Sequence, residues 1–428
     1  MDAVAATVAE RVAALRDERI DHRFKGLPPD ADGLTVGELT EQHRSLTNGG
    51  FSTPLLVLSA EALDHNLAAL ERWTTDHGLA FAPHGKTSMA PRLFARQLDH
   101  GAWGITVAVP HQLRVARAFG IPRVFLANEL VDPAALRQVA AELDADPGFT
   151  LVCYVDSVHG VALMDAALAA AGARRPLDVV VELGAGEGAR TGVRTEAEAL
   201  AVAEATTAAA HLRLVGVAGY EGEVPAADPD RVRAWLRRLT ALAATLDSTG
   251  AFSDTDHVIV SAGGSAWFDA VAEVFADLPA LSRPALPLLR SGAYVTHDDQ
   301  HYARITPFTR VPGHLEPAFR LWAQVVSRPS PTQAFLNAGK RDAPYDLGLP
   351  TPLTVRTPTG SRPAPADLRV TGISDQHLWL DVPPTDPLQV GDLVSLGVSH
   401  PCTTFDKWPL IPVATTDGTV TEYVRTFF

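Results

Sequence analysis

The sequence predicts an α/β protein in which a (β/α)₈ TIM barrel is followed by a C-terminal all-β domain. Between residue 51 and about residue 285, short apolar runs rich in β-branched residues alternate with longer segments of helical periodicity. Eight such runs over this length match the strand number and the size of a closed barrel. After about Ser282, proline becomes dense and short alternating strands replace the helical pattern. An open, doubly wound sheet is the alternative architecture for the first part.

The expected elements follow from these patterns. The barrel strands are Pro54–Leu58, Leu79–Ala82, Gly104–Val107, Arg123–Ala127, Thr150–Val155, Leu177–Glu182, Arg213–Ala218 and His257–Ser261. Helices are expected over 59–75, 132–143, 157–171 and 228–246, opening with the N-cap residues Ser59, Asp132, Ser157 and Asp228. Later strands are Phe319–Ser327, Thr332–Asn337, Leu368–Gly372, His377–Val382, Asp392–Val398 and Thr419–Thr426. We therefore expect a helical segment over 1–50 that packs on the body, a barrel over 51–285 and a β domain over 286–428.

Composition limits the classes of partner. With 46% hydrophobic and 20% charged residues, the chain is of ordinary globular type. A net charge of −14 argues against a nucleic-acid partner, which would need a basic face. No window is apolar over the length needed to span a membrane, and the first residues lack a secretory signal pattern. The two cysteines, Cys153 and Cys402, are expected to be reduced thiols, so the cytoplasm is the predicted location.

Lys86 is the first candidate for chemistry. It lies just past the end of an expected strand, in Phe81-Ala82-Pro83-His84-Gly85-Lys86-Thr87-Ser88, and only four of the 36 basic residues are lysines. A lysine amine can be deprotonated by desolvation and can form an imine, whereas an arginine cannot. The loops that follow barrel strands form the face where active sites lie. Lys86 is therefore predicted to be a Schiff-base residue; the alternative is a surface turn lysine.

A glycine-rich turn is the second candidate. Gly263, Gly264 and Ser265 follow the last expected barrel strand and precede a helix, which suits a phosphate because backbone N–H groups and a helix N-terminus favour an anion. A plain strand-to-helix turn is the alternative. A lysine imine and a phosphate site on one barrel face suggest pyridoxal 5′-phosphate (PLP). A class I aldolase that uses lysine without a cofactor fits the same facts.

A third candidate lies near the C-terminus. His400 and Cys402 flank Pro401 after an expected strand, and two residues so spaced can point to one side of an extended chain. Imidazole and thiolate suit zinc, and two protein ligands leave positions open for water or substrate. The alternative is a buried cysteine beside a histidine whose hydrogen bonds are satisfied.

The segment Pro83-His84-Gly85-Lys86-Thr87 resembles the Pro-His-x-Lys-Thr motif of fold-type III PLP enzymes. Specifically, the chain resembles the D-serine dehydratases and D-threonine aldolases, relatives of the alanine racemases. Further stretches occur in family order: Arg190-Thr191-Gly192-Val193, Gly263-Gly264-Ser265, Arg290-Ser291-Gly292-Ala293-Tyr294-Val295, Asn337-Ala338-Gly339 and His400-Pro401-Cys402-Thr403. The resemblance implies an alanine-racemase-type barrel, an imine between PLP and Lys86, a metal on His400 and Cys402, and a homodimer.

The resemblance also implies roles and an activity. His84 is expected near Lys86, Arg190 and Tyr220 at the cofactor ring or its nitrogen, and Tyr294 with Gly263, Gly264 and Ser265 at the phosphate. The metal is expected to be zinc, with manganese as the alternative. The expected reaction removes water from a D-3-hydroxy amino acid, D-serine or a D-threonine-like one, giving a 2-oxo acid and ammonia. Retro-aldol cleavage to glycine and an aldehyde, racemisation, and a PLP-binding protein without enzymatic activity are the alternatives.

Overall fold

The chain forms two compact units whose segments interleave along the sequence; the computed structural model describes residues 2–428. Residues 70–86 and 97–292 form the first unit, together with the start of the chain up to Val8. Residues 9–69, 87–96 and 293–428 form the second. Three helices, α1 (Asp2–Ala13), α3 (Ala60–Asp76) and α4 (Pro91–Asp99), contain residues of both units.

The first unit is built on a parallel sheet of eight strands, in the order β2-β9-β8-β7-β6-β5-β4-β3. The strands are β2 (Ala80–Phe81), β3 (Ile105–Val107), β4 (Arg123–Glu129), β5 (Thr150–Val155), β6 (Leu177–Leu183), β7 (Leu212–Gly219), β8 (Val258–Ala262) and β9 (Ala285–Leu289). Backbone hydrogen bonds from Trp103 to Phe81 (2.6 Å) and from Thr106 to Pro83 (2.9 Å) join the first strand to the last in this order. The sheet therefore closes on itself, as the predicted barrel requires.

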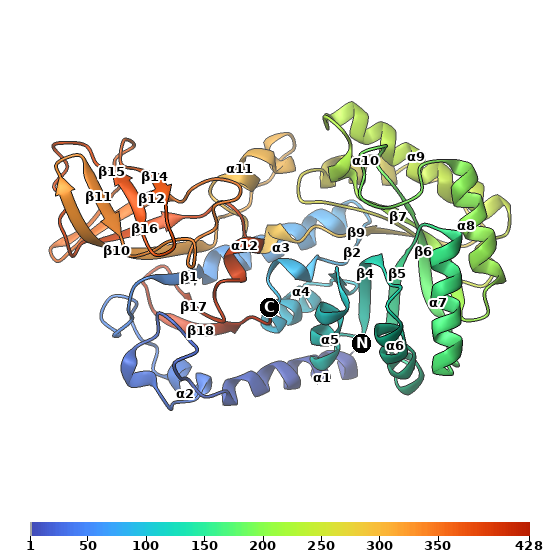
Figure 1. Ribbon diagram of the computed structural model, residues 1–428, viewed down its shortest axis with the longest axis horizontal. Coiled ribbons are helices and arrows are strands. Elements are labelled where there is room, and N and C mark those ends of the chain that lie inside the picture. Colours follow the sequence, from blue (N-terminus) through green and yellow to red (C-terminus); the bar gives the residue numbers. More distant parts are fainter. Residues whose placement is uncertain (1) are drawn as a thin grey trace. The chain divides into compact units, whose positions relative to one another are not determined.

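Helices cover the outer face of this sheet, as Figure 1 shows for α6 to α9 around β4 to β7. They are α5 (Pro110–Ala118), α6 (Pro133–Ala145), α7 (Val158–Ala171), α8 (Glu196–Ala208), α9 (Pro229–Ser248) and α10 (Phe268–Phe275). The predicted caps are confirmed: Asp132, Ser157 and Asp228 accept hydrogen bonds from the N–H three residues on, at 2.7, 3.2 and 2.9 Å. Ser59 caps α3 in the same way, at 3.2 Å.

The expected first barrel strand is wrong. Leu55–Ser59 forms β1, which pairs with β10 (Phe319–Ser330) and β17 (Leu410–Ala414) in the sheet of the second unit. Its side chains are buried on both faces, and a central strand of either sheet gives that apolar pattern. The eighth barrel strand is β9, which contains Pro287, a residue that argues against an interior strand. Lys86 thus follows the first barrel strand, and Gly263 follows the seventh.

The second unit is built on a ten-stranded, mainly antiparallel sheet that contains the strands expected after residue 318. Besides β1, β10 and β17, its strands are β11 (Gln333–Leu336), β12 (Thr351–Thr357), β13 (Gly360–Pro363), β14 (Arg369–Ile373), β15 (Leu378–Asp381), β16 (Leu393–Gly397) and β18 (Val420–Arg425). Its short helices are α2 (Val36–Glu41), α11 (His301–Ile305) and α12 (Cys402–Phe405). β12, β13 and β17 each contain proline or lack a clear alternation, and the sequence did not predict them.

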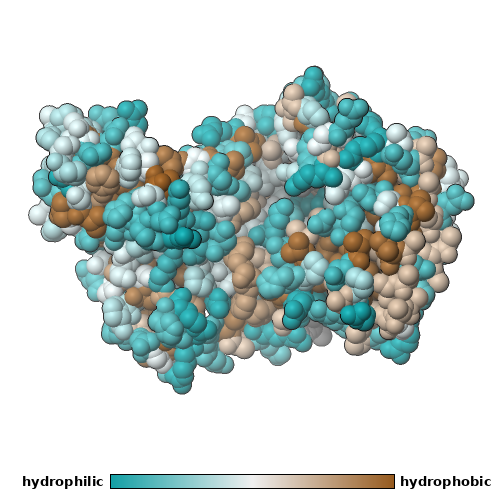
Figure 2. All heavy atoms as spheres, viewed as in Figure 1, coloured by the Kyte–Doolittle hydropathy of each residue, from teal (hydrophilic) through white to brown (hydrophobic). Residues whose placement is uncertain are grey.

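Each unit has its own apolar core. In the barrel, inward-facing side chains such as Phe125, Val152 and Val180 pack together. In the second unit, Ile20 and Phe24 from the N-terminal segment share a cluster with apolar residues of β1, β17 and β18. On the face drawn in Figure 2, hydrophilic side chains predominate and hydrophobic ones gather in small groups. Among residues 2–428, no helix combines the length and the apolar composition of a membrane span.

Candidate active site

The carboxyl ends of the barrel strands carry a lysine, a histidine, several carboxyl groups and an arginine. Lys86 lies there, in the short 3₁₀ turn η3 (Gly85–Thr87) after β2, with an exposed side chain. The other three lysines lie in the second unit. Lys25 pairs with Asp342 at 2.7 Å, Lys407 pairs with Asp406 at 3.1 Å, and Lys340 lies over the ring of Tyr345. The position of Lys86 is thus distinct from that of every other lysine in the chain.

His84 is half-buried and lies two residues before Lys86. Burial lowers the pKa of its imidazole well below the usual value, and the positive charges of Lys86 and Arg290 lower it further. The ring is therefore neutral at pH 7. Its Nδ1 atom is buried and has no hydrogen-bond partner within the described chain. A buried polar atom of this kind calls for a group from outside the protein.

Three carboxyl groups gather at the ends of adjacent strands. Glu129 ends β4, Asp156 follows β5, and Glu182 lies near the end of β6, with one oxygen of each within 4.8 Å of the others. Burial raises the pKa of Glu129 to about 8, and the charge of Glu182 adds to the effect. Burial likewise raises the pKa of Glu182. One oxygen of Glu129 and one of Glu182 are buried without a partner among the described residues. The cluster therefore holds at least one proton at neutral pH.

We expect Glu129→Gln to be more stable than the wild type at alkaline pH. The folded-state pKa of about 8 lies above the usual 4.5, so the wild type loses stability as pH rises from 4.5 through 8, whereas glutamine does not titrate. Each pKa unit corresponds to about 1.4 kcal/mol, and part of the effect belongs to Glu182. The free energy of unfolding should therefore rise by about 2–4 kcal/mol at pH 9 and change by almost nothing at pH 4.5. Urea unfolding of the purified protein across this range measures it. Glu204→Gln, an exposed glutamate on α8, is the control; a gain independent of pH would contradict the assignment.

Arg290 follows β9 and is the buried cation of this face. It is 3% exposed, and its guanidinium donates to the Ser261 hydroxyl (2.8 Å) and to the Gly219 carbonyl (2.6 Å). It also lies over the rings of Phe125 and Tyr154, at 5.1 and 5.7 Å from their centroids. Arg290 could not be given a role from the sequence, because one arginine does not stand out in an arginine-rich chain.

The backbone N–H groups of the predicted phosphate turn donate to a carboxylate of the protein itself. Glu221 is fully buried and accepts hydrogen bonds from the N–H groups of Gly263 (2.9 Å) and Gly264. Gly263 has a φ of +137°, and a Cβ at Gly264 would lie 2.8 Å from the Tyr220 ring, so both positions require glycine. The first two donors of the turn are thus used by Glu221. The phosphate role of Gly263, Gly264 and Ser265 stays a prediction.

The other predicted cofactor residues lie in different settings. Tyr220 packs against the glycine turn, and burial raises the pKa of its phenol to about 12. Arg190 leaves 75% of its side chain exposed and pairs with Glu223. Tyr294 is 3% exposed and is counted with the second unit. Of this set, the structure brings Tyr220 into contact with Gly264.

The candidate metal ligands lie in the second unit, at the start of α12. The expected extended chain is wrong here, because Pro401 adopts helical angles and the helix begins at Cys402. The Nδ1–H group of His400 donates to the Asp346 carboxylate at 2.6 Å, and the Cys402 sulfur lies 3.5 Å from the Thr87 hydroxyl. Burial lowers the pKa of His400, but Cys402 and Asp346 outweigh burial and raise the pKa to about 9.

Asp346 is a site residue that the sequence did not reveal. It lies 54 residues before His400 in the chain, in a loop, and its second oxygen accepts from the Thr403 hydroxyl at 2.9 Å. A carboxylate on one ring nitrogen of a histidine fixes the ring and leaves the other nitrogen for a metal. His400 and Cys402 could therefore hold a metal ion, with Asp346 as the carboxylate that orients His400.

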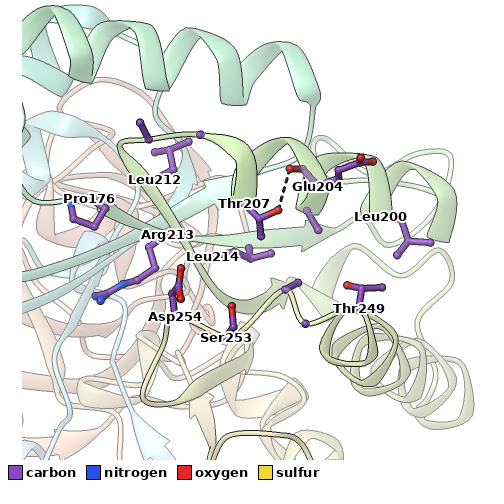
Figure 3. A pocket seen from close by; sticks show the side chains of 15 residues that line it. Pro176, Leu200, Glu204, Thr207, Leu212, Arg213, Leu214, Thr249, Ser253 and Asp254 are labelled. Atoms are coloured by element: carbon purple, nitrogen blue, oxygen red, sulfur yellow. Dashed lines mark hydrogen bonds between the residues drawn. The ribbon is translucent and has the colours of Figure 1, made fainter.

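A hollow of about 740 Å³ lies at the other end of the barrel strands. Figure 3 shows its lining from the starts of β6 and β7, the end of α8 and the loop after α9, including Pro176, Leu212, Thr207 and Ser253. Its arginine, Arg213, is already paired with Asp178 at 2.7 Å. Because active sites of barrels lie at the carboxyl ends of the strands, this hollow is not the candidate active site.

A closed parallel barrel with a lysine past its first strand, joined to an antiparallel β domain, is the architecture of alanine racemase-like proteins. Residues 30–276 match the family described as "Alanine racemase, N-terminal domain", and residues 318–414 match the "Putative serine dehydratase domain". The chain belongs to the fold-type III PLP-dependent enzymes, in the group of D-serine dehydratases and D-threonine aldolases.

Individual relatives agree with this family. The chain is 30% identical to the D-threonine aldolase of an Arthrobacter species over 361 residues, 83% of this chain and 86% of that protein. The crystal structure of D-threonine aldolase from Filomicrobium marinum superposes with a TM-score of 0.74, at 27% identity, over 88% of this chain and 95% of that one. The D-threo-3-hydroxyaspartate dehydratase from Delftia sp. HT23 shares the fold, with a TM-score of 0.70 at 22% identity over 90% and 99% of the two chains.

The barrel residues fit PLP. The cofactor needs an amine for covalent attachment and polar partners for its ring, and the strand ends offer Lys86 together with unpartnered atoms of His84, Glu129 and Glu182. Arg290 supplies a buried positive charge at the same end of the strands. The fit supports the family assignment from this chain's own side chains.

Proposed function

We propose that the protein is a PLP- and metal-dependent lyase that removes water from a D-3-hydroxy amino acid and releases a 2-oxo acid and ammonia. The observation that carries the proposal is His400 beside Cys402, held by Asp346, in a chain of this PLP family. A hydroxyl group is a poor leaving group unless its oxygen is bound to a Lewis acid, and a histidine–cysteine pair suits a zinc ion in that role. A racemase has no need of such a site.

The barrel residues take the following parts. PLP, when bound, draws electrons from the carbon that carries the substrate's amino group and so acidifies the proton on that carbon. Lys86 would hold the cofactor and, once displaced by the substrate's amine, remove that proton. His84 stays neutral beside it, so it donates or accepts a hydrogen bond without competing for the proton. Glu129 and Glu182 keep their shared proton within the site, and Arg290 offsets their charge.

The second unit would hold the metal. Asp346 binds Nδ1 of His400, which leaves Nε2 for the ion, and the Cys402 thiolate supplies the second protein ligand. The ion would bind the substrate's 3-hydroxyl oxygen and make it a better leaving group. The Thr403 hydroxyl donates to the other oxygen of Asp346. This second hydrogen bond holds the carboxylate that orients His400.

Retro-aldol cleavage is the second candidate reaction. Two relatives above 25% identity are D-threonine aldolases, and a metal on the 3-hydroxyl can also assist removal of its proton. In that case, the bond between the second and third carbons breaks, and glycine and an aldehyde are released. The same residues serve both reactions, so the products must decide between them.

A product assay tests the proposal. With purified holoenzyme and D-serine, D-threonine or D-3-hydroxyaspartate, we expect ammonia and a 2-oxo acid in equal amounts, and no product from the L-enantiomers. If glycine and an aldehyde are formed instead, the reaction is aldol cleavage and not elimination. Recovery of the L-enantiomer would indicate racemisation. No turnover of any D-amino acid, with PLP bound, would leave a PLP-binding protein without this activity.

A further inference from the structure

Two histidines and a glutamate gather in the second unit and share no residue with the His400 site. His65 comes from α3, and His314 and Glu316 come from the segment that leads into β10. One donor atom from each lies within 4.8 Å of the others. The Glu316 carboxylate is 3.9 Å from Nδ1 of His65 and 3.8 Å from Nε2 of His314. The two imidazole rings are 4.2 Å apart between centroids.

A buried asparagine fixes the two segments against each other. Asn66 is 0% exposed; its side chain accepts from the Glu316 N–H at 2.7 Å and donates to the Glu316 carbonyl at 2.8 Å. The same amide also donates to the Val295 carbonyl at 3.3 Å. Because Asn66 is the next residue after His65, these bonds place Glu316 beside His65. The three donors are therefore brought together by the fold, and they do not meet by chance on mobile loops.

A hydrogen bond of His65 determines which of its ring nitrogens has a free lone pair. Nε2 of His65 lies 3.2 Å from the His314 carbonyl oxygen, which can only accept, so Nε2 carries the proton. Neutral His65 then has its lone pair on Nδ1, the atom that faces Glu316. Metal-binding histidines usually show this arrangement, with one nitrogen donating to a carbonyl and the other left for the ion.

We propose that His65, His314 and Glu316 bind a divalent transition-metal ion, zinc in particular. Two imidazoles and one carboxylate form a ligand set that zinc accepts with a fourth position open to water. Donors around tetrahedral zinc lie about 3.4 Å apart, so the three donor atoms, which lie within 4.8 Å of one another, must move closer by side-chain rotation to bind the ion. The side chains of His314 and Glu316 are 69% and 46% exposed, so an ion can reach them from the solvent. The ion would tie the start of α3 to the segment before β10.

Zinc stoichiometry tests the site without reference to catalysis. Chelator-stripped protein is titrated with Zn²⁺, and bound metal per chain is measured for the wild type, His314→Ala and Glu316→Gln. We expect His314→Ala to bind one zinc ion fewer than the wild type, and Glu316→Gln to bind that ion at least tenfold more weakly. His159→Ala, which removes an exposed histidine from α7, should match the wild type. Equal stoichiometry and affinity in the wild type and both cluster variants would overturn the proposal.

Cobalt separates this site from the one at Cys402. Co²⁺ bound to nitrogen and oxygen ligands gives visible d–d bands, and only a thiolate ligand adds a charge-transfer band in the near ultraviolet. His314→Ala should lose part of the visible absorption and keep any charge-transfer band. If that band is absent from the wild type, the metal role of Cys402 fails and the His65 site stands. If His314→Ala instead loses only the charge-transfer band, the His65 site fails. Unchanged circular dichroism confirms that each variant is folded.

Discussion

Lys86→Arg should lose turnover of D-3-hydroxy amino acids by a factor of at least about 10³, since both imine formation and proton removal are lost. Arginine keeps the positive charge that lowers the pKa of His84. Its guanidinium, however, stays protonated at neutral pH, so it can neither attach PLP nor accept a proton. The variant therefore separates the chemistry of the lysine from its charge. Steady-state kinetics and the visible absorption of lysine-bound PLP are the two measurements.

The other lysines provide the control for this variant. Lys407→Arg keeps a cation beside Asp406, whose carboxylate lies 3.1 Å from the amine, and should leave activity and absorption unchanged. Borohydride reduction of the wild type should fix PLP on the peptide that contains Lys86. A label on a peptide with Lys25, Lys340 or Lys407 would remove Lys86 from the centre of the site. So would substantial turnover by Lys86→Arg.

The fold could be predicted from the sequence where a local pattern decides it. The strand and helix alternation and four helix caps follow from residue type and spacing, and the structure confirms them. β1 and β9 could not be assigned, because the sheet that a strand joins depends on contacts distant in sequence. β1 is as apolar as a barrel strand but pairs with β10, and β9 keeps its place in the barrel despite Pro287.

The candidate site divides in the same way. Lys86 and the His400–Cys402 pair were found because lysine and cysteine are rare in the chain and because His400 and Cys402 are closely spaced, whereas His84 was named through the family resemblance. Glu129 and Arg290 were not assigned roles, because what distinguishes them is burial at the strand ends and the charges around them. Asp346 gave no signal at all, since it meets His400 only through the fold. Rare residues are visible in a sequence, whereas an environment that shifts a pKa is visible only in a structure.

Cys402→Ala should lose the catalytic metal and at least about 10² in turnover, because Lewis-acid assistance contributes several kcal/mol and each 1.4 kcal/mol is tenfold in rate. PLP should stay bound, since Lys86 is unchanged. The loss should therefore appear in turnover and metal content, and not in the visible spectrum. Chelation of the wild type should have the same effect, and added zinc or manganese should restore the wild type but not the variant.

The second cysteine makes this prediction specific. Cys153 is fully buried in β5, and burial raises the pKa of its thiol, so it is neither accessible to an ion nor ionised. Cys153→Ala should keep its metal and its activity, apart from any loss of stability from the smaller side chain. If Cys402→Ala keeps turnover, or chelation leaves elimination intact, the metal has no part in the reaction. The histidine–cysteine pair with Asp346 would then be a structural contact. The leaving hydroxyl would need an acid from the barrel instead, and Glu129 is the candidate, because its pKa of about 8 keeps it protonated at neutral pH.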